Sequence, residues 1–548
     1  MPTPKPALAA SLGAALTAAT LILAAPAQGA PAAPVVRTAS GPVAGIVKGG
    51  SVQFLGLPFA APPTGALRWR PPVAPAPWKA VRRAAAFGPQ CAQSTTLGVF
   101  AGPPNSNEDC LTLNVIAPRA AAGGKTRLPV LVWLHGGGNV DGSASDYDAA
   151  ALAVKGRAIV VTVNYRLNLF GFMAHPAIDK EGHPFANYGL LDQQFALKWV
   201  RTNIARFGGD PANVTLGGQS AGGSNTGLHL TSPLARGLFH KAVIVSSGSY
   251  LTAASLPQAQ AKGVAMAKAA GCGEGTDEAT AACLRALPAE AIMRLAGTPT
   301  ANGAFILPII ADGQVVPTGG ASAFEQGRFT RMPVINGTVR DEGGFFTGIE
   351  QYGNGTPPWR TITNESVERT VRGAYAANAE RILAAYPAAR YATPQWRSNA
   401  IQSDAFVCKS HKATHLLAGK VPLYVYEFRD RTAPSYFPDM PGYEPGAYHT
   451  ADLLYLFPGF HGTGIKRDLT PRQQRLADRM ISLLGNFMRT GNPNAAVKGK
   501  GGNAPWPAVT AKAANYIAFN ANGLGTISDA GFASDHQCAL WQEILPFN

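Results

Sequence analysis

The pentapeptide Gly218-Gln219-Ser220-Ala221-Gly222 decides how this chain of 548 residues is interpreted. It follows the short apolar run Val214-Thr215-Leu216 and opens an apolar stretch that is compatible with a helix. A serine on a tight strand-to-helix turn projects its hydroxyl out of the fold, and small flanking residues let the backbone turn without a clash. The pattern therefore predicts a nucleophilic serine at Ser220. A glycine-rich turn with a solvated serine is the competing interpretation, and the remaining motifs decide between the two.

Two further groups complete the chemistry that such a serine requires. A serine hydroxyl is a poor nucleophile at neutral pH, so it needs a histidine base and an acid that orients the base. The carboxylates Asp341 and Glu342 follow the apolar run 332–335, and His449 lies farther on in a loop-like sequence. Ligands of open α/β sheets bind at the carboxyl ends of strands. The order Ser220, Glu342, His449 is the α/β-hydrolase order of nucleophile, acid and base, with Asp341 as the competitor for the acid.

A glycine triplet, Gly136-Gly137-Gly138, stands upstream at the end of the apolar run 128–134. Bare backbone at such a triplet can approach a ligand, and its N–H groups can donate to a developing oxyanion together with the N–H of Ala221. A phosphate-binding loop is the alternative. That alternative needs a P-loop lysine or a dinucleotide-binding spacing, and neither follows the triplet.

Short apolar runs alternate with a helical pattern over the first half of the chain. They have the composition of buried strands in a mostly parallel sheet, and they span 128–134, 158–163, 214–216 and 242–245. Residues 190–204 suit a helix that packs on this sheet, which together predicts an α/β doubly wound layer architecture. Segments 45–47 and 52–56 indicate a small antiparallel N-terminal sheet. The Ala-rich stretches 252–300 and 355–420 indicate helical insertions around the active site.

The first residues are typical of a secretory signal peptide. They contain one positive charge at Lys5, an apolar run over 7–25 and small residues over 27–32. A membrane anchor is the alternative, but Pro26 breaks the run and no stop-transfer flank follows. We expect a signal peptide over about 1–30 and one α/β-hydrolase catalytic domain over 31–548. We also expect a secreted or periplasmic protein with no integral membrane segment after processing.

Six cysteines, an even number in a chain that we expect to be exported, indicate a disulfide framework. Six cysteines allow about 15 connectivities. Proximity in the sequence favours Cys91 with Cys110 and Cys272 with Cys283, which leaves Cys408 for Cys538. No cysteine has metal-ligand spacing.

The chain is basic, with 47 Lys and Arg against 32 Asp and Glu and a formal net charge of +15. Such a surface can attract anionic substrates or polymers. The alternative is that the charge only tunes solubility. Because no long run of Lys and Arg interleaves with aromatic residues, the sequence disfavours nucleic-acid binding.

These motifs together resemble the type-B carboxylesterase/lipase family of α/β-hydrolases, which includes bacterial and animal carboxylesterases and the cholinesterases. The resemblance covers nearly the whole chain after the leader. In chain order it rests on residues 54–60 (FLGLPFA), 108–114 (EDCLTLN), the glycine triplet, 164–166 (NYR), 189–193 (GLLDQ), 207–211 (FGGDP), the Ser220 pentapeptide, 341–343 (DEG) and 491–493 (GNP).

The resemblance implies a secreted bacterial carboxylesterase in which Ser220 is the nucleophile and His449 the general base and acid. Glu342, second in the Asp-Glu-Gly triplet, becomes the orienting acid. The N–H groups of Gly137, Gly138 and Ala221 become the oxyanion donors, and the three disulfides match the pairings that proximity favours.

The same resemblance bears on Ser247, cofactors and partners. Ser247 resembles a serine that some members hydrogen-bond to the triad, with a plain turn serine as the alternative. No metal and no organic cofactor are implied, and the partner is a small or polymeric ester substrate. Whether the chain is a monomer or a homodimer is left open.

Several residues depart from the family pattern, and these departures narrow the range of substrates that we expect. Gln219 stands where cholinesterases have glutamate, and a neutral amide does not supply the charge that favours a quaternary ammonium. No tryptophan lies between Cys91 and Cys110 to stack on a cation. Asn139 replaces the usual aromatic, and the expected acyl-pocket segment 304–307 has one aromatic, which together imply a roomier or more polar pocket.

These departures favour an esterase for a broad range of carboxylic esters over a cholinesterase. An esterase that acts on polyesters, carbamates or amides is the alternative within enzymes. A non-catalytic binding protein on the same fold is the alternative from another class.

Overall fold

A computed structural model describes residues 34–94, 99, 103–121, 124, 126–296, 309–353, 355–460, 462, 464–494 and 506–545. The expected signal peptide and the expected acyl-pocket segment 304–307 lie outside the described residues. Part of the loop between Cys91 and Cys110 also lies outside them.

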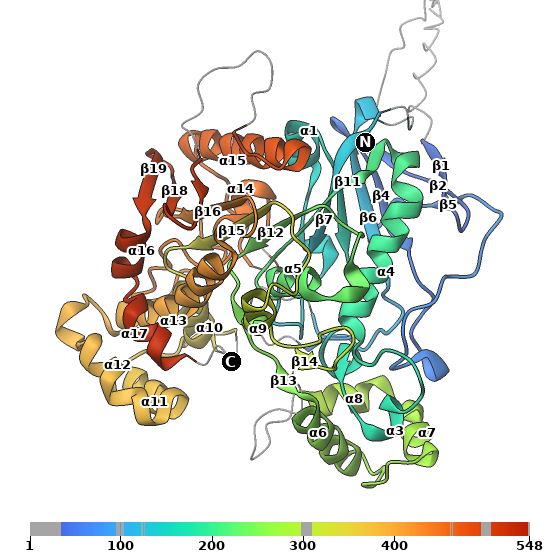
Figure 1. Cartoon of the computed structure of the whole chain (residues 1–548), viewed down its shortest axis with the longest axis horizontal. Coiled ribbons are helices and arrows are strands. Elements are labelled where there is room, and N and C mark those ends of the chain that lie inside the picture. The colour runs from blue at the N-terminus through green and yellow to red at the C-terminus, as the bar shows by residue number, and fades with distance from the viewer. Residues whose placement is uncertain are drawn as a thin grey trace, which may run out of the picture.

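A mixed sheet of 12 strands, flanked by helices, forms the centre of the molecule (Figure 1). In the order in which they lie across the sheet, the strands are β19 (Gly523–Ser528), β18 (Asn515–Asn520), β16 (Leu423–Phe428), β15 (Val334–Val339), β12 (Lys241–Val245), β11 (Gly209–Gln219), β7 (Leu128–Leu134), β8 (Ile159–Val163), β6 (Thr112–Pro118), β4 (Ser51–Pro58) and β3 (Ile46–Lys48), with β17 (Ala508–Val509) paired to β16. From β8 to β18 every neighbouring pair along this path is parallel. The predicted α/β class is therefore confirmed.

The central strands are buried along almost their whole length. β8 and β12 have no exposed residue, and β7 is buried from its second residue onward. Parallel strands are covered on both faces, which explains why their sequences are continuous apolar runs rather than alternating ones. The strand that precedes Ser220 is longer than the run 214–216 predicted, because β11 begins at Gly209 and passes a register shift before Val214.

The N-terminal strands differ from the expected arrangement. β3 and β4 pair in antiparallel fashion, as the sequence predicted, but β4 also pairs with β6 and so extends the large sheet. A separate small sheet forms instead from β1 (Val35–Arg37), β2 (Pro42–Ala44) and β5 (Arg82–Arg83). The reason is that β4 is long and almost wholly buried, so its free edge bonds to the neighbouring strand of the core.

Side-chain capping sets the start of some of the longer helices. α4 (Tyr188–Asn203) matches the predicted helix over 190–204. α15 (Pro471–Thr490) begins after Thr470, whose side chain forms a capping box with Gln473, and ends at Gly491 with φ 77°. The other helices that matter below are α1 (Ala150–Gly156), α5 (Ala221–Thr231), α10 (Gly343–Tyr352), α13 (Pro394–Leu417), α14 (Leu453–Leu456), α16 (Asp529–Asp535) and α17 (Cys538–Ile544).

The two Ala-rich stretches form helices, as predicted. They contribute α6 (Leu256–Ala269), α7 (Glu278–Ala286), α8 (Ala289–Ala296), α11 (Asn364–Tyr375), α12 (Ala379–Ala385) and α13. In Figure 1 the first group projects below the sheet on one side, and α11 and α12 project on the other.

Three disulfides join the pairs that the sequence favoured, Cys91 with Cys110, Cys272 with Cys283 and Cys408 with Cys538. The last pair is separated by 130 residues and ties α17 to α13. Closing so long a loop reduces the entropy of the unfolded chain by an amount worth up to about 5 kcal/mol. None of the helices in the described ranges combines the length and the apolar character needed to cross a bilayer.

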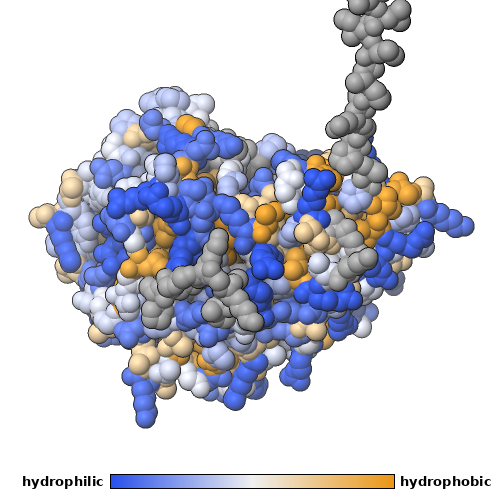
Figure 2. Space-filling model, turned by 90° about the horizontal axis from the view of Figure 1, so that it is seen from above, coloured by the Kyte–Doolittle hydropathy of each residue, from blue (hydrophilic) through white to orange (hydrophobic). Residues whose placement is uncertain are grey.

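The face of the molecule seen in Figure 2 mixes hydrophilic and hydrophobic residues at short range. Apolar residues form small patches between charged and polar ones rather than one continuous area.

A buried ionic cluster reinforces the junction between α13 and the C-terminal segment, which contains α16 and α17. The imidazole of His536 lies between two carboxylates, with Nδ1 2.8 Å from Asp404 and Nε2 2.6 Å from Glu427. Burial by itself lowers the pKa of His536, but the two carboxylates outweigh it and raise that pKa to about 9. His536 is therefore positively charged at neutral pH, and its charge compensates the two buried carboxylates.

We predict that this cluster makes the stability of the fold fall at alkaline pH. The pKa of His536 is higher in the folded chain than the unfolded value of about 6.5. Its contribution is therefore complete below about pH 6.5 and is lost as the pH rises through about 9, at up to about 1.4 kcal/mol per pH unit. The measurement is the urea midpoint of unfolding between pH 6 and pH 10.

The matched variants are His536→Gln, which removes the titrating group, and His240→Gln, which alters an exposed histidine elsewhere. The first should be less stable at pH 6.5 and lose the alkaline decline, whereas the second should keep it. An equal alkaline decline in His536→Gln and the wild type would contradict the role of this cluster.

Candidate active site

Ser220 lies on the turn between β11 and α5, at the carboxyl end of a central strand. Its backbone has φ 57° and ψ −122°, a conformation that costs free energy for any residue with a side chain. Its N–H donates to the carbonyl of Val245 in the neighbouring strand β12 at 2.9 Å. The strained turn holds the Ser220 side chain at the edge of the sheet, where it is only partly buried.

Two glycines make the turn sterically feasible. A Cβ on Gly218 would lie 2.4 Å from the carbonyl carbon of Gly222, and a Cβ on Gly222 would lie 2.1 Å from the carbonyl oxygen of Leu134. Real Cβ atoms do not approach other atoms so closely. The small residues of the pentapeptide are therefore required because α5 packs directly against the end of β7.

The predicted acid and base meet although they are 107 residues apart. Nδ1 of His449 forms a short hydrogen bond with Oε2 of Glu342, and both side chains are almost completely buried. The second oxygen of Glu342 accepts from the N–H of Val339 at 3.1 Å. His449 comes from the loop before α14, and Glu342 caps the start of α10 just beyond β15.

The competing carboxylate, Asp341, has a different partner. Its two oxygens accept from Nε and Nη2 of Arg431 at 2.8 and 2.7 Å, and Oδ2 also accepts from the N–H of Ala447. A bidentate ion pair of this kind fixes the orientation of both groups. Asp341 therefore braces the loop that carries His449, and Glu342 is the carboxylate that reaches the imidazole.

Gln219 contacts the same imidazole from the other side. Its amide nitrogen lies 2.9 Å from Nε2 of His449, and the side chain is completely buried. With Nδ1 donating to Glu342, Nε2 carries the lone pair and the amide of Gln219 is the donor. Gln219 precedes Ser220 in the chain, and the fold also places its amide on the imidazole of His449, 230 residues away in the chain.

The buried carboxyl group of Asp452 lies close to Glu342 and His449, and no sequence motif pointed to it. Burial raises the pKa of Asp452 to about 6, and the charge of Glu342 acts in the same direction. The hydroxyl of Tyr426 donates to its Oδ2 at 2.7 Å. Its position three residues after His449 was the only signal in the sequence.

The expected oxyanion donors converge beside Ser220. Gly137 and Gly138 have φ 108° and 63°, and a Cβ on Gly137 would lie 2.1 Å from the carbonyl oxygen of Asp141. Within the described ranges, no protein acceptor takes the backbone N–H of Gly137, Gly138 or Ala221. The N–H groups are thus available to an oxygen of a bound molecule.

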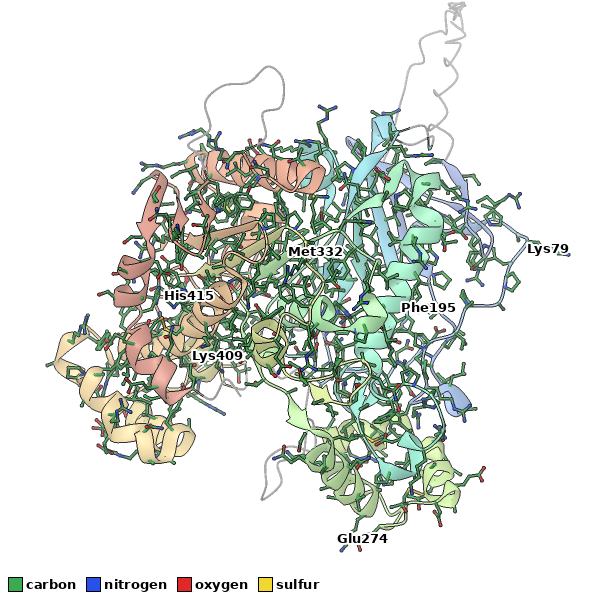
Figure 3. The ribbon with its side chains drawn as sticks, viewed as in Figure 1. Lys79, Phe195, Glu274, Met332, Lys409 and His415 are labelled. Atoms are coloured by element: carbon green, nitrogen blue, oxygen red, sulfur yellow. A yellow bond between two sulfur atoms is a disulfide. The ribbon has the colours of Figure 1, made fainter. Side chains whose placement is uncertain are left out.

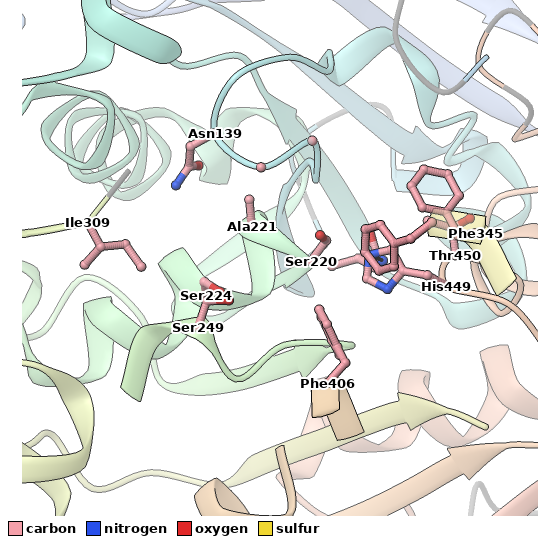
Figure 4. A pocket seen from close by; sticks show the side chains of 14 residues that line it. Asn139, Ser220, Ala221, Ser224, Ser249, Ile309, Phe345, Phe406, His449 and Thr450 are labelled. Atoms are coloured by element: carbon pink, nitrogen blue, oxygen red, sulfur yellow. Dashed lines mark hydrogen bonds between the residues drawn. The ribbon is translucent and has the colours of Figure 1, made fainter. Parts of the chain in front are cut away.

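A cavity of about 260 Å³ joins these groups. Figure 4 shows Ser220 and His449 side by side, with Phe406 close to both and Asn139 and Ile309 toward the other end. The described lining consists of Gly137, Gly138, Asn139, Gln219, Ser220, Ala221, Ser224, Ser249, Ile309, Phe345, Phe346, Phe406, His449 and Thr450. The three phenylalanines come from α10 and α13, and α13 lies within the predicted insertion over 355–420.

At the end of the cavity away from His449, the buried amide of Asn139 lies beside the apolar Ile309 (Figure 4). The amides of Asn139 and Asn225 form a reciprocal pair, with nitrogen-to-oxygen distances of 3.2 and 2.9 Å. Asn139, which departs from the family pattern, is 2% exposed. No sequence motif pointed to its partner Asn225. The hydroxyl of Ser247 lies 2.6 Å from that of Ser224, so this serine, which the resemblance placed near the triad, contacts a serine of the pocket wall.

The other buried histidines nearby have structural surroundings. Burial lowers the pKa of His135 to about 4 and that of His229 to about 3, so both are neutral at physiological pH. His135 stacks on Tyr165 beneath the glycine triplet, and Nε2 of His229 lies 2.8 Å from Oε1 of Gln193. Neither lines the cavity.

Comparison with known proteins gives the same family over nearly the full length. Residues 32–541 match the model of the carboxylesterase family. The chain is 32% identical to the acylcarnitine hydrolase of Mus musculus over 84% of each chain, and 32% identical to the para-nitrobenzyl esterase of Bacillus subtilis over 86% of this chain and 92% of that protein. It is 38% identical to the fumonisin B1 esterase of Sphingopyxis macrogoltabida over 66% of this chain and 70% of that protein.

The family match covers the whole described sheet and all of the motifs noted in the sequence. The relatives are named as hydrolases or esterases. This chain belongs to the carboxylesterase family of α/β-hydrolases and is a carboxylic-ester hydrolase.

Proposed function

We propose that the chain hydrolyses esters through an acyl-enzyme on Ser220. His449 takes the proton of the serine hydroxyl as the oxygen attacks the ester carbonyl, and Glu342 orients and stabilises the imidazolium. The tetrahedral oxyanion is bound by the N–H groups of Gly137, Gly138 and Ala221. The alcohol leaves with a proton from His449, and water activated by the same imidazole then releases the acid.

The observation that carries this proposal is the hydrogen bond between His449 and Glu342 at the same cavity that Ser220 lines. An oriented base, a strained nucleophile turn and unengaged backbone donors converge on one space of about 260 Å³. Acyl transfer needs these three groups together. A binding protein has no need of the strained turn.

For the substrate we propose a broad set of small to medium carboxylic esters and not choline esters. Gln219 brings no negative charge to the cavity. The phenylalanines suit an apolar portion of the ester, and the side chain of Asn139 suits a polar portion. Polyesters, carbamates and amides use the same machinery and are tested as alternatives in an activity panel.

We further propose that residues 31–548 form one catalytic domain and that residues 1–30 are removed on export. All six cysteines are paired in disulfides, which supports a secreted or periplasmic location because such compartments are oxidising.

We predict that Ser220→Ala lowers kcat for p-nitrophenyl butyrate by at least about 1,000-fold, because the nucleophile is lost while the pocket stays intact. A fluorophosphonate probe should label the wild type once per chain and leave the variant unlabelled. The measurements are initial rates and intact-protein mass spectrometry, with circular dichroism to establish folding.

The matched control is Ser249→Ala, which removes another hydroxyl from the same cavity. It should keep full labelling and a rate within tenfold of the wild type. Rapid turnover or labelling of a folded Ser220→Ala protein would show that another residue is the nucleophile.

We predict that Gln219→Glu moves the acidic limb of kcat/KM against pH upward by about one pH unit. A carboxylate within hydrogen-bond distance of Nε2 favours the imidazolium, and the unprotonated base is then reached only at higher pH. Gln219→Met removes the donor to the Nε2 lone pair without adding charge, so its acidic limb should move upward by less than that of Gln219→Glu. An unchanged limb in Gln219→Glu would mean that residue 219 does not act on the base.

A further inference from the structure

We propose that His411, His415 and Asp529 form a binding site for one divalent transition-metal ion, with Zn²⁺ as the best fit, outside the active site. The three residues were not connected in the sequence, where both histidines lack a recognised motif and the aspartate follows more than 100 residues later. In the described part of the chain they are the one group of at least three His, Cys, Asp or Glu side chains whose ligand atoms lie within 4.8 Å of one another.

The three ligand atoms form a compact triangle. Nε2 of His411 lies 2.8 Å from Oδ1 of Asp529, Nε2 of His415 lies 3.2 Å from the same oxygen, and the two nitrogens are 3.1 Å apart. An ion placed about 1 Å above the centre of this triangle is about 2 Å from each atom, which is the length of zinc bonds to nitrogen and oxygen.

Hydrogen bonds alone fit this triangle poorly. A neutral imidazole carries at most one hydrogen on Nε2, so the two nitrogens supply at most two hydrogens for three mutual contacts. If both nitrogens donate to Asp529, their own contact at 3.1 Å places two N–H groups against each other. A cation that accepts a lone pair from each atom satisfies all three contacts at once.

The helical structure of α13 places the two histidine ligands on the same side of the helix. His411 and His415 are separated by four residues on α13, so their side chains lie on the same face of the helix one turn apart. Asp529 is the first residue of α16, whose cap is Ser528. In Figure 3 His415 lies where α13 meets the C-terminal elements.

Neighbouring polar groups hold the ligands in place. The amide nitrogen of Gln542 lies 3.1 Å from Nδ1 of His411, and the hydroxyl of Tyr516 hydrogen-bonds to Oδ1 of Asp529. Partners behind the ligands orient them in established metal sites. The amide of Gln542 would present its oxygen to Nδ1–H once the metal occupies Nε2, which only exchanges the two ends of the amide.

Burial and ligand type select the ion. The side chains of His411, Asp529 and His415 are 5%, 30% and 46% exposed, so the triangle is covered on one side and open to water on the other. Two imidazoles with one carboxylate suit zinc and its neighbours, whereas Ca²⁺ and Mg²⁺ prefer oxygen ligands. Water completes the coordination at the open side.

The location of the site indicates what the ion does. The ion would join α13 to α16. The Cys408–Cys538 disulfide and the hydrogen bond between His536 and Asp404 also join α13 to the C-terminal part of the chain. α13 carries Phe406 of the cavity as well. Because the ion would bind the folded chain and not the unfolded one, it should stabilise the C-terminal segment without taking part in the reaction.

The experiment is titration of tag-free, chelator-treated protein with ZnSO4 alone, followed by calorimetry and by thermal unfolding. We expect one ion per chain with a micromolar or lower Kd and a rise in Tm of about 2–4 °C at saturation. Co²⁺ should give the intense visible absorption of a four-coordinate site.

The decisive variant is His415→Gln. Glutamine keeps a hydrogen bond to Asp529 but is a poor zinc ligand, so Zn²⁺ affinity should fall at least about 100-fold, with loss of the cobalt absorption and of the Tm rise. His240→Gln removes an exposed histidine elsewhere and should bind as the wild type does. The absence of stoichiometric binding by the wild type, or equal binding by His415→Gln, would overturn the proposal.

Discussion

The backbone of Ser220, held at φ 57° and ψ −122°, is the constraint on which the rest of the active site depends. A turn this strained persists only when its surroundings over-determine it. Here β11 is fixed between parallel neighbours β7 and β12, and α5 lies so close to the end of β7 that a Cβ on Gly222 would meet the carbonyl oxygen of Leu134. The same closeness brings the glycine triplet that follows β7 to the serine. One steric requirement thus positions both Ser220 and the backbone N–H groups of the glycine triplet.

Helix α13 connects this site with the C-terminal segment. Near its middle, Ser403 accepts from the N–H of Gly343, the residue after Glu342, and Phe406 lines the cavity. Farther along, Cys408 is bonded to Cys538, and the pair of His411 and His415 meets α16. The covalent, ionic and proposed metal links therefore hold one helix that also shapes the pocket.

Much of the fold could be predicted because its elements have local signatures. The central strands are continuous apolar runs, since parallel strands are buried on both faces, and α4 has the spacing of a helix that covers them. Two disulfides close short loops, and the third followed by elimination. The N-terminal strands were the exception. Whether β4 pairs only with β3 or also with β6 depends on which edge of the sheet is free, and a strand sequence does not encode its neighbour.

The sequence by itself determined the candidate nucleophile, acid and base and their order, because Ser220 and Glu342 stand in short motifs after strands and His449 follows them in a loop-like sequence. Only the tertiary structure decided their partners. It paired Asp341 with Arg431 and brought Glu342 to His449, it set the amide of Gln219 against the base, and it joined Asn139 to Asn225. It also brought Asp529 to two histidines more than 100 residues earlier. Such contacts follow from how strands and helices pack across the whole chain, and a local pattern carries no information about them.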